Sequence, residues 1–326
     1  MEPPYRPQGN DIVADNNDRV AWLASVWTQE KGRRIASTTS DAQSSTITYL
    51  TESQYWDYKP ITSPDGSKIA FFRATNEMDK KTGDVTLWRS KICVMNPDGT
   101  DVKELTDDAY FNSNLHWTRD GTNRITWFRI INETGEPNTY SRVKIWRTSS
   151  DAVPGEEEML SDPNDPEYFR EYSHSNLKDG RIYLLRGSRR NFLMTPDPVG
   201  KPTYEPISYP YDPMHLHKIC ISHDETKISY MKQTMENLAK DEYMGSIICY
   251  ADFEASVPAI TNEVKITEQD YSSLIWYTSF SPDDKRILYT VDGKVMEHDI
   301  ATGTSRKVST DDSVEYRYPN YLGSVK

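Results

Sequence analysis

One short pattern recurs along the chain and limits what the chain can fold into. An apolar stretch leads into a turn built around an aspartate, and a second stretch with alternating apolar residues follows it. The copies are "YKPITSPDGSKIAFFR" (58–73), "NLHWTRDGTNRITWFR" (114–129), "SHSNLKDGRIYLLR" (173–186), "HKICISHDETKISYMK" (217–232) and "YTSFSPDDKRILYT" (277–290), with a weaker copy, "IVADNNDRVAWLAS" (12–25). A strand, an aspartate turn and an alternating strand together predict a β-hairpin.

A second kind of module follows several of these hairpins. "SKICVMNPDGTDVKELT" (90–106) has an apolar strand, a Pro-Asp-Gly turn and a strand that ends in Leu-Thr, and "RRIASTTSDAQSSTITYLT" (33–51) and "GKVMEHDIATGTSRKVS" (293–309) copy it. Successive hairpin aspartates lie 45 to 59 residues apart. Four strands in about 50 residues is the period of a β-propeller blade. The sequence therefore predicts an all-β fold, a β-propeller with four antiparallel strands per blade.

Six blades can be counted, and a seventh, partial blade stays open as an alternative. The tail "SVEYRYPNYLGSVK" (313–326) is expected to add a strand that closes the ring or to cap one face. Since no low-complexity linker divides the chain, we expect residues 1–326 to form a single propeller domain.

Composition narrows the range of partners. The net charge of −12 argues against nucleic acid and anionic membranes, and no apolar run approaches the ~20 residues of a membrane span. Cys93, Cys220 and Cys249 each lie in an apolar, strand-like run, which favours buried thiols over disulfides. We expect a monomer or weak oligomer, in the cytoplasm, or in the periplasm or outside the cell if a leader has been removed.

Residues that enter the inner strands are expected at one mouth of the propeller, because all inner strands of a propeller run the same way along the channel. These residues are Tyr58, His116, His174, His217 and Tyr277, with His215 two residues before His217. Four of the six histidines thus fall in this group.

The second strand of each hairpin returns to the same mouth, and its end is basic in four successive blades. The residues are Arg73, Arg129, Arg186 and Lys232, with Arg189 and Arg190 just beyond. A ring of cations on an acidic protein would focus the field for an anionic ligand. The alternative is that these cations pair with loop carboxylates.

His215 and His217 raise the question of a metal site. The period of two in a strand points both imidazoles to one side, which is a recurrent spacing for zinc, copper, iron or nickel. Asp212 lies three residues earlier, and His174 in the neighbouring blade is the natural third imidazole. The alternative for any single histidine is a hydrogen-bonded structural role.

The two repeated modules resemble the TolB-type propeller repeat, whose blades carry a Ser-Pro-Asp-Gly-Lys turn and a Leu-Thr close. The resemblance covers nearly the whole chain and implies the propeller fold. It leaves function open, because propellers include both enzymes and binding platforms.

Within that superfamily the chain resembles the oligogalacturonate lyases, which bind a divalent metal through Gln-x-x-His-x-His and a histidine of another blade. Asp212, His215 and His217 match the first segment with Asp for Gln, and His174 resembles the remote ligand. His116, in "LHWTRDG", resembles the general base. The sequence departs from that family because its last blade, "IWYTSFSPDD", lacks the His-x-His. The more distant ulvan lyases use His, Tyr and Arg instead.

The favoured hypothesis is therefore a lyase that cleaves an anionic, uronate-containing oligosaccharide or polysaccharide by β-elimination. A divalent metal (manganese, zinc or similar) at Asp212, His174, His215 and His217, or an arginine, would stabilise the enolate-like charge. His116 would be the base. The remaining assignments are Arg129, Arg186 and Arg189 to the substrate carboxylate and Tyr58 or Tyr277 as the acid.

Two other classes stay open. A non-catalytic TolB-like propeller that binds a protein or peptide fits the fold and the acidic charge equally well. A glycoside hydrolase would need paired carboxylates, and the inner-strand entries offer only Asp57 and Asp212.

Overall fold

The computed structural model describes residues 20–28, 30, 32–40, 45–52, 56–74, 89–107, 110–130, 143–165, 169–186, 190–197, 201–210, 216–232, 247–267, 275–309 and 311–323. Every helix or strand element in these ranges is a β-strand. Accordingly, this part of the chain contains no helix that is long and apolar enough to cross a membrane.

The strands form four-stranded antiparallel sheets, numbered here as blades from the inner strand outward. Blade 1 consists of β24 (Glu315–Tyr321), β1 (Val20–Thr28), β2 (Gly32–Ser40) and β3 (Ser45–Tyr49). Blade 2 consists of β4 (Trp56–Thr62), β5 (Ile69–Ala74), β6 (Ser90–Met95) and β7 (Lys103–Glu104). Blade 3 consists of β8 (Phe111–Trp117), β9 (Arg124–Ile130), β10 (Val143–Ser149) and β11 (Glu158–Met159).

The other three blades repeat this order along the chain. Blade 4 consists of β12 (Phe169–Asn176), β13 (Ile182–Arg186), β14 (Arg190–Thr195) and β15 (Thr203–Pro206). Blade 5 consists of β16 (Leu216–Ile221), β17 (Lys227–Lys232), β18 (Ile247–Glu254) and β19 (Ala259–Lys265). Blade 6 consists of β20 (Ile275–Phe280), β21 (Arg286–Val291), β22 (Lys294–Asp299) and β23 (Thr304–Lys307).

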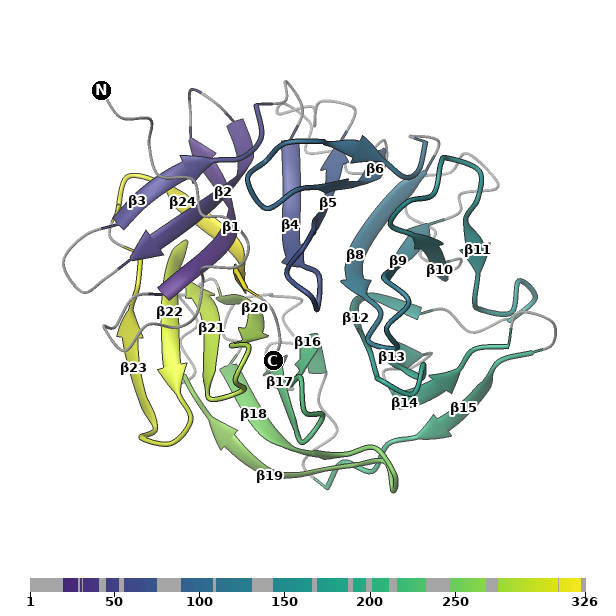
Figure 1. The fold of residues 1–326 in the computed structure, drawn as a ribbon. Coiled ribbons are helices and arrows are strands. Elements are labelled where there is room, and N and C mark those ends of the chain that lie inside the picture. The colour runs from purple at the N-terminus through teal and green to yellow at the C-terminus, as the bar shows by residue number, and fades with distance from the viewer. Residues whose placement is uncertain are drawn as a thin grey trace, which may run out of the picture.

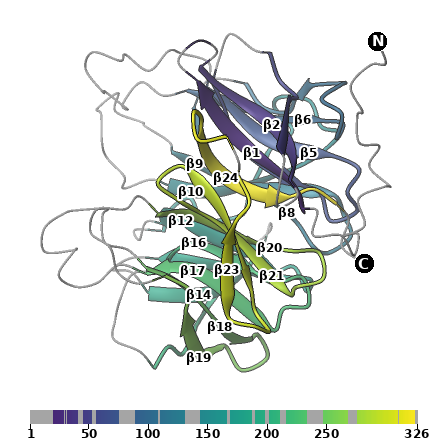
Figure 2. The same ribbon diagram turned by 90° about the vertical axis from the view of Figure 1, so that its left-hand side faces the viewer.

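The blades form a ring that the C-terminal strand closes. Their inner strands contact one another in the order β24, β4, β8, β12, β16, β20 and back to β24, and Figure 1 shows the sheets following one another around the centre. β24 pairs antiparallel with β1, with Trp22 opposite Tyr321 and Trp27 opposite Glu315, and Figure 2 shows the two side by side. The predicted propeller, with six blades in the described residues and a closing strand in the tail, is confirmed.

The aspartate turns hold the inner hairpins. In each of five hairpins a carboxylate oxygen accepts a hydrogen bond from the backbone N–H two residues further on, at 2.9 to 3.2 Å; the aspartates are Asp65, Asp120, Asp179, Asp224 and Asp283. This is the local bond that makes aspartate a turn residue. The weaker copy around Asp18 lies outside the described residues.

The hydrophobic core lies between the blades. Six clusters of buried side chains occur in the described residues, and each combines apolar residues of two neighbouring sheets. All three cysteines are free thiols, as predicted: Cys93 and Cys249 are buried and Cys220 is half-buried. Because adjacent sheets share their cores, the stability of each blade depends on both neighbours.

Substitutions of Tyr316 in β24 test how much the closing strand contributes to the free energy of unfolding. Its ring is fully buried and meets the Trp22 ring edge-on at 5.3 Å, while its hydroxyl has no hydrogen-bond partner among the described residues. Tyr316→Ala should lower the free energy of unfolding by about 3–5 kcal/mol, as for other large buried aromatic residues. Tyr316→Phe, the matched control, should leave it unchanged or raise it slightly. Chemical denaturation measures both, and equal losses for the two variants would contradict the role of ring packing.

Candidate functional site

Five inner strands, β4, β8, β16, β20 and β24, share an irregularity that redirects one residue in each. The described residues with positive φ in inner strands are Lys59 (47°), Asn114 (51°), Lys218 (54°), Tyr277 (35°) and Tyr318 (56°). The register of each of these strands against its partner shifts at the same point. Such a β-bulge redirects side chains and is common beside functional sites.

A pocket runs from these bulges toward the ends of the inner strands, where the hairpin turns lie. All six inner strands contribute residues to its wall. Its charged or titratable residues include Lys59, Arg119, Lys218, His116 and His223, and no Asp or Glu is among its described lining residues. On a chain of net charge −12, a pocket of this composition favours an anion.

Lys59 lies at the inner end of this pocket and is only 5% exposed. Its Nζ donates a hydrogen bond to Asn114 Oδ1 and lies 3.3 Å from His116 Nε2. Desolvation by burial, reinforced by the charge of Lys218, holds the pKa of Lys59 well below its usual value. Compared with an exposed lysine, this shift favours the uncharged amine over the ammonium.

Tyr277 lies beside both buried lysines. Lys218 Nζ donates to the Tyr277 hydroxyl at 3.2 Å and lies 4.3 Å from the ring centroid. Lys59 Nζ lies 5.2 Å from the same centroid. The Tyr318 ring packs on the Tyr277 ring at 4.3 Å. One aromatic ring therefore brings the two amino groups close together.

His116 and His174 complete the polar wall. Asn114 Nδ2 donates to His174 Nδ1 at 3.1 Å, so His174 Nε2 carries the proton and donates to Thr126 Oγ1 at 3.1 Å. The rings of His116 and His174 meet edge-on at 4.6 Å. Burial, with the charge of Lys59 second, lowers the pKa of both histidines well below the ordinary value. Both are therefore neutral bases at pH 7.

The environment of His174 bears on the predicted metal site. Both of its ring nitrogens are engaged, so it fits a hydrogen-bond relay and would have to break one bond to bind a metal. His217 is half-buried in β16, while Asp212 and His215 lie outside the described residues. The described part of the chain contains no group of three or more His, Cys, Asp or Glu residues arranged to hold a metal. The four-ligand site stays a prediction.

Four of the six predicted strand-end cations lie outside the described pocket wall and pair with carboxylates, and the Arg190 side chain is not described. The pairs are Arg73–Asp57 (2.7 Å), Arg129–Glu157 (3.3 Å), Arg186–Asp165 (2.8 Å) and Lys232–Glu263 (2.7 Å). This is the arrangement that the sequence left open as the alternative to an anion-binding ring. Arg189 lies outside the described residues.

The two predicted tyrosines have different surroundings. Tyr277 lines the pocket, whereas Tyr58 is buried in the core between blades 2 and 3, with its ring stacked on Phe72 at 5.1 Å. Of the catalytic residues predicted from sequence, the structure thus brings His116 and Tyr277 together at the pocket and places Tyr58, Arg129 and Arg186 elsewhere.

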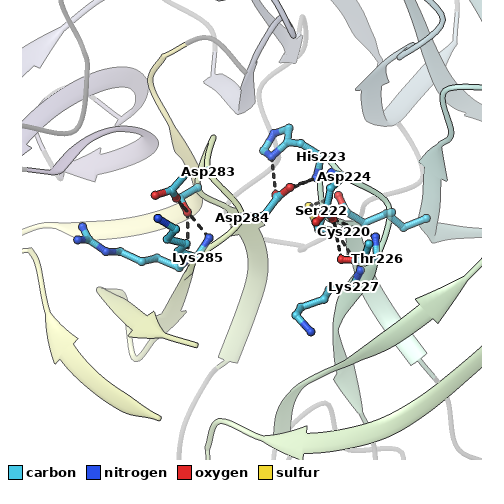
Figure 3. A network of polar contacts seen from close by, with 12 residues as sticks. Cys220, Ser222, His223, Asp224, Thr226, Lys227, Asp283, Asp284 and Lys285 are labelled. Carbon is cyan, nitrogen blue, oxygen red and sulfur yellow. Dashed lines mark hydrogen bonds and ion pairs between the residues drawn. The ribbon is translucent and has the colours of Figure 1, made fainter. Parts of the chain in front are cut away.

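Two side chains at the pocket rim link the blades. The Arg119 guanidinium donates to the carbonyl oxygens of Ile221 (2.6 Å) and Ser222 (2.7 Å), which connects blade 3 to blade 5. His223 Nδ1 lies 2.7 Å from Asp284 Oδ1, across the turns of blades 5 and 6, as Figure 3 shows. When Nδ1 donates to this carboxylate, Nε2 of His223 is the basic nitrogen.

The sequence analysis missed Lys59, Asn114 and Lys218 as pocket residues, although a signal was present. Each bulge residue lies six positions before the turn aspartate of its hairpin: Lys59, Asn114, Lys218 and Tyr277 precede Asp65, Asp120, Asp224 and Asp283 by the same interval. The residues taken from the sequence as strand entries lie four to seven positions before these aspartates, and a constant interval would have found both lysines.

Comparisons with known proteins support the fold. The solved structure of TolB from Acinetobacter baumannii superposes with a TM-score of 0.66 at 13% identity, over 95% of this chain and 68% of that one. The hydrazine synthase of Kuenenia stuttgartiensis gives 0.61 at 15% identity, over 95% and 47%. An oligogalacturonate lyase in complex with manganese gives 0.51 at 12% identity, over 87% and 73%. No family model and no curated protein matches the chain.

These similarities confirm the resemblance to TolB-type propellers and to oligogalacturonate lyase at the level of the fold. At such low identity they do not assign a role to any residue of this chain. The function must therefore be argued from the pocket itself.

The depressed pKa values of His116 and His174 predict how stability depends on pH. The unfolded chain takes up protons on these residues below about pH 6.5, whereas the folded chain resists them. Stability should therefore be fully present above that pH and fall below it, by up to about 1.4 kcal/mol per pH unit for each histidine. Urea denaturation at a series of pH values measures the slope. His174→Gln should reduce this slope by the contribution of one proton. Identical slopes for wild type and variant would contradict a depressed pKa of His174.

Proposed function

We propose that the chain binds a carboxylate-bearing, uronate-containing saccharide through the channel pocket and cleaves it by β-elimination. The proposal rests on the composition of the pocket wall. The wall contains Lys59, Lys218 and Arg119, and its described lining residues include no Asp or Glu. Such a wall supplies the positive charge that an anionic substrate needs, and burial strengthens each interaction.

The pocket contains a residue for each step of the elimination. Lys218 neutralises the substrate carboxylate, joined by Lys59 once the bound carboxylate has raised its pKa, and this makes the neighbouring α-proton acidic. His116 is the base, since it is neutral at pH 7. Tyr277, held by Lys218 through its hydroxyl, protonates the leaving oxygen.

In this proposal, binding of the substrate also frees His116 from Lys59 so that it can act as the base. In the unbound pocket His116 Nε2 lies 3.3 Å from Lys59 Nζ and accepts a hydrogen bond from it when the imidazole proton is on Nδ1. A substrate carboxylate competes for the Lys59 amino group and raises its pKa. The lone pair of His116 is then released to take the α-proton.

A binding scaffold without catalysis is the competing proposal, and the similarity to TolB supports it equally. The same cationic pocket would then hold an acidic peptide side chain or chain terminus. Ligand selectivity and turnover separate the two.

Binding of digalacturonate tests the proposed pocket. Lys218→Met removes one charged donor and should cost about 1.5–3 kcal/mol, which weakens Kd by a factor of about 10 to 100. Lys265→Met, at an exposed position on β19, is the matched control and should bind like wild type. Cellobiose, which is uncharged, should not bind. Titration calorimetry measures all four, and equal affinity of wild type and Lys218→Met would overturn the pocket assignment.

Catalysis is tested by the ultraviolet absorbance of the unsaturated product. His116→Gln should keep digalacturonate binding and lower turnover of oligogalacturonate by about 10²–10⁴-fold, as expected for loss of a general base. Binding without turnover by the wild-type chain on uronate oligosaccharides would leave the scaffold as the function.

The metal predicted at Asp212, His174, His215 and His217 has a separate test. If these residues hold a divalent ion, the purified chain should contain about one metal per molecule, and His217→Ala should lose it. Equal metal content in both proteins would remove this site. The chemistry proposed above has no step that depends on it.

A further inference from the structure

The amino group of Lys59 has an unusual set of partners. It contacts Asn114 Oδ1, His116 Nε2 and the face of the Tyr277 ring, and none of these partners is a carboxylate. Asn114 Oδ1 is an acceptor, because Nδ2 of the same amide donates to His174. His116 Nε2 accepts as well when the imidazole proton is on Nδ1.

Two acceptors match the two N–H groups of a neutral primary amine. An amine bound in this way keeps its lone pair, whereas the third N–H of an ammonium would have only the face of the Tyr277 ring, with its centroid 5.2 Å from Nζ, among these contacts. The Lys218 amino group shares the Tyr277 ring, which disfavours a second positive charge there. The depressed pKa of Lys59 agrees with this geometry.

The same pocket offers groups that would orient a substrate toward this lone pair. Lys218 and Arg119 are on the pocket wall with Lys59, and both are donors that suit a carboxylate. A ligand whose carboxylate binds at these donors presents its neighbouring carbon to Lys59. A carbonyl at that carbon is the natural target of a buried, uncharged lysine.

We propose that Lys59 is a nucleophilic amine that forms an imine with the carbonyl of a small 2-oxo acid, such as glyoxylate or pyruvate, whose carboxylate is held by Lys218 and Arg119. This rests on the anion-binding part of the proposed function and is independent of the elimination chemistry.

The step balances without a further reactant. The Lys59 lone pair attacks the carbonyl carbon, and a proton moves from nitrogen to oxygen to give a carbinolamine. Loss of the hydroxyl group as water then forms the C=N bond, so that amine and 2-oxo acid give imine and water. His116, beside Nζ, is placed to carry the proton between nitrogen and oxygen.

Trapping of the imine by reduction tests the proposal on the wild-type chain. The protein is incubated with glyoxylate and sodium cyanoborohydride near neutral pH, where the reagent supplies hydride to the C=N bond and leaves a carboxymethyl group on nitrogen. Peptide mass spectrometry then compares the lysines. Lys59 should be modified faster than exposed lysines such as Lys265, by on the order of tenfold for each pKa unit separating them. Modification of exposed lysines with Lys59 left intact would overturn the proposal.

Two controls test the roles of the groups around Lys59. Acetaldehyde, which lacks the carboxylate, should modify Lys59 more slowly than glyoxylate does, and equal rates would overturn the carboxylate clamp. Lys218→Met should slow the reaction of glyoxylate at Lys59, whereas Lys265→Met should leave it unchanged. The same rate in all three proteins would remove Lys218 from the site.

Failure of this inference is distinguishable from failure of the proposed function. Suppose that digalacturonate binds without protecting any lysine from modification, and that glyoxylate leaves Lys59 unmodified. The anion-binding pocket then stands, and the nucleophilic role of Lys59 is rejected. If Lys59 is modified selectively but digalacturonate neither binds nor competes, the imine site stands and the uronate proposal is rejected.

Discussion

The channel exists because β24 pairs with β1. This single antiparallel pairing joins residues from the two ends of the chain into one blade and completes the ring of inner strands. The pocket depends on that closure directly, since β24 contributes Tyr318 and Tyr321 to its wall and Tyr318 packs on Tyr277. An open ring would expose Lys59 and Lys218 to water on one side. Their desolvation, and with it the altered chemistry of Lys59, is therefore a property of the closed fold more than of the local sequence.

The bulges convert this ring into a site. A regular strand alternates its side chains between two faces, so an inner strand would send every second residue into a neighbouring blade. At Lys59, Asn114, Lys218 and Tyr277 the backbone adopts positive φ and the register shifts. None of these four is glycine, so each pays a conformational cost that the surrounding sheet must offset. Residues held in this way cluster at functional positions in other proteins, and here they are the residues that contact one another across the channel.

The sequence predicted the architecture well and the site only in part, for a physical reason. Blade number and strand pairing follow from periodic hydrophobicity and from turn aspartates, both of which are local signals. The tail after the sixth hairpin was expected either to close the ring or to cap one face, and it closes the ring as β24. His116 and Tyr277, which the sequence singled out for catalytic roles, line the pocket, whereas Lys59 was not singled out. A bulge shifts the side-chain alternation by one position, and a strict period of two therefore assigns the wrong face on one side of it.

The two groups of cations show why residue type alone did not identify the site. Arg73, Arg129 and Arg186 are each matched by a carboxylate, so they stabilise local structure and present little net field. The surroundings of the pocket lysines differ. Although the chain is rich in Asp and Glu, none of the described Asp or Glu residues lines the pocket wall. Burying an amino group costs free energy, which the polar contacts of Lys59 and Lys218 and the packing of the ring offset. A cost of this kind is typical of a site kept for its chemistry, because Lys59 gains an available lone pair from the same desolvation that destabilises its charge.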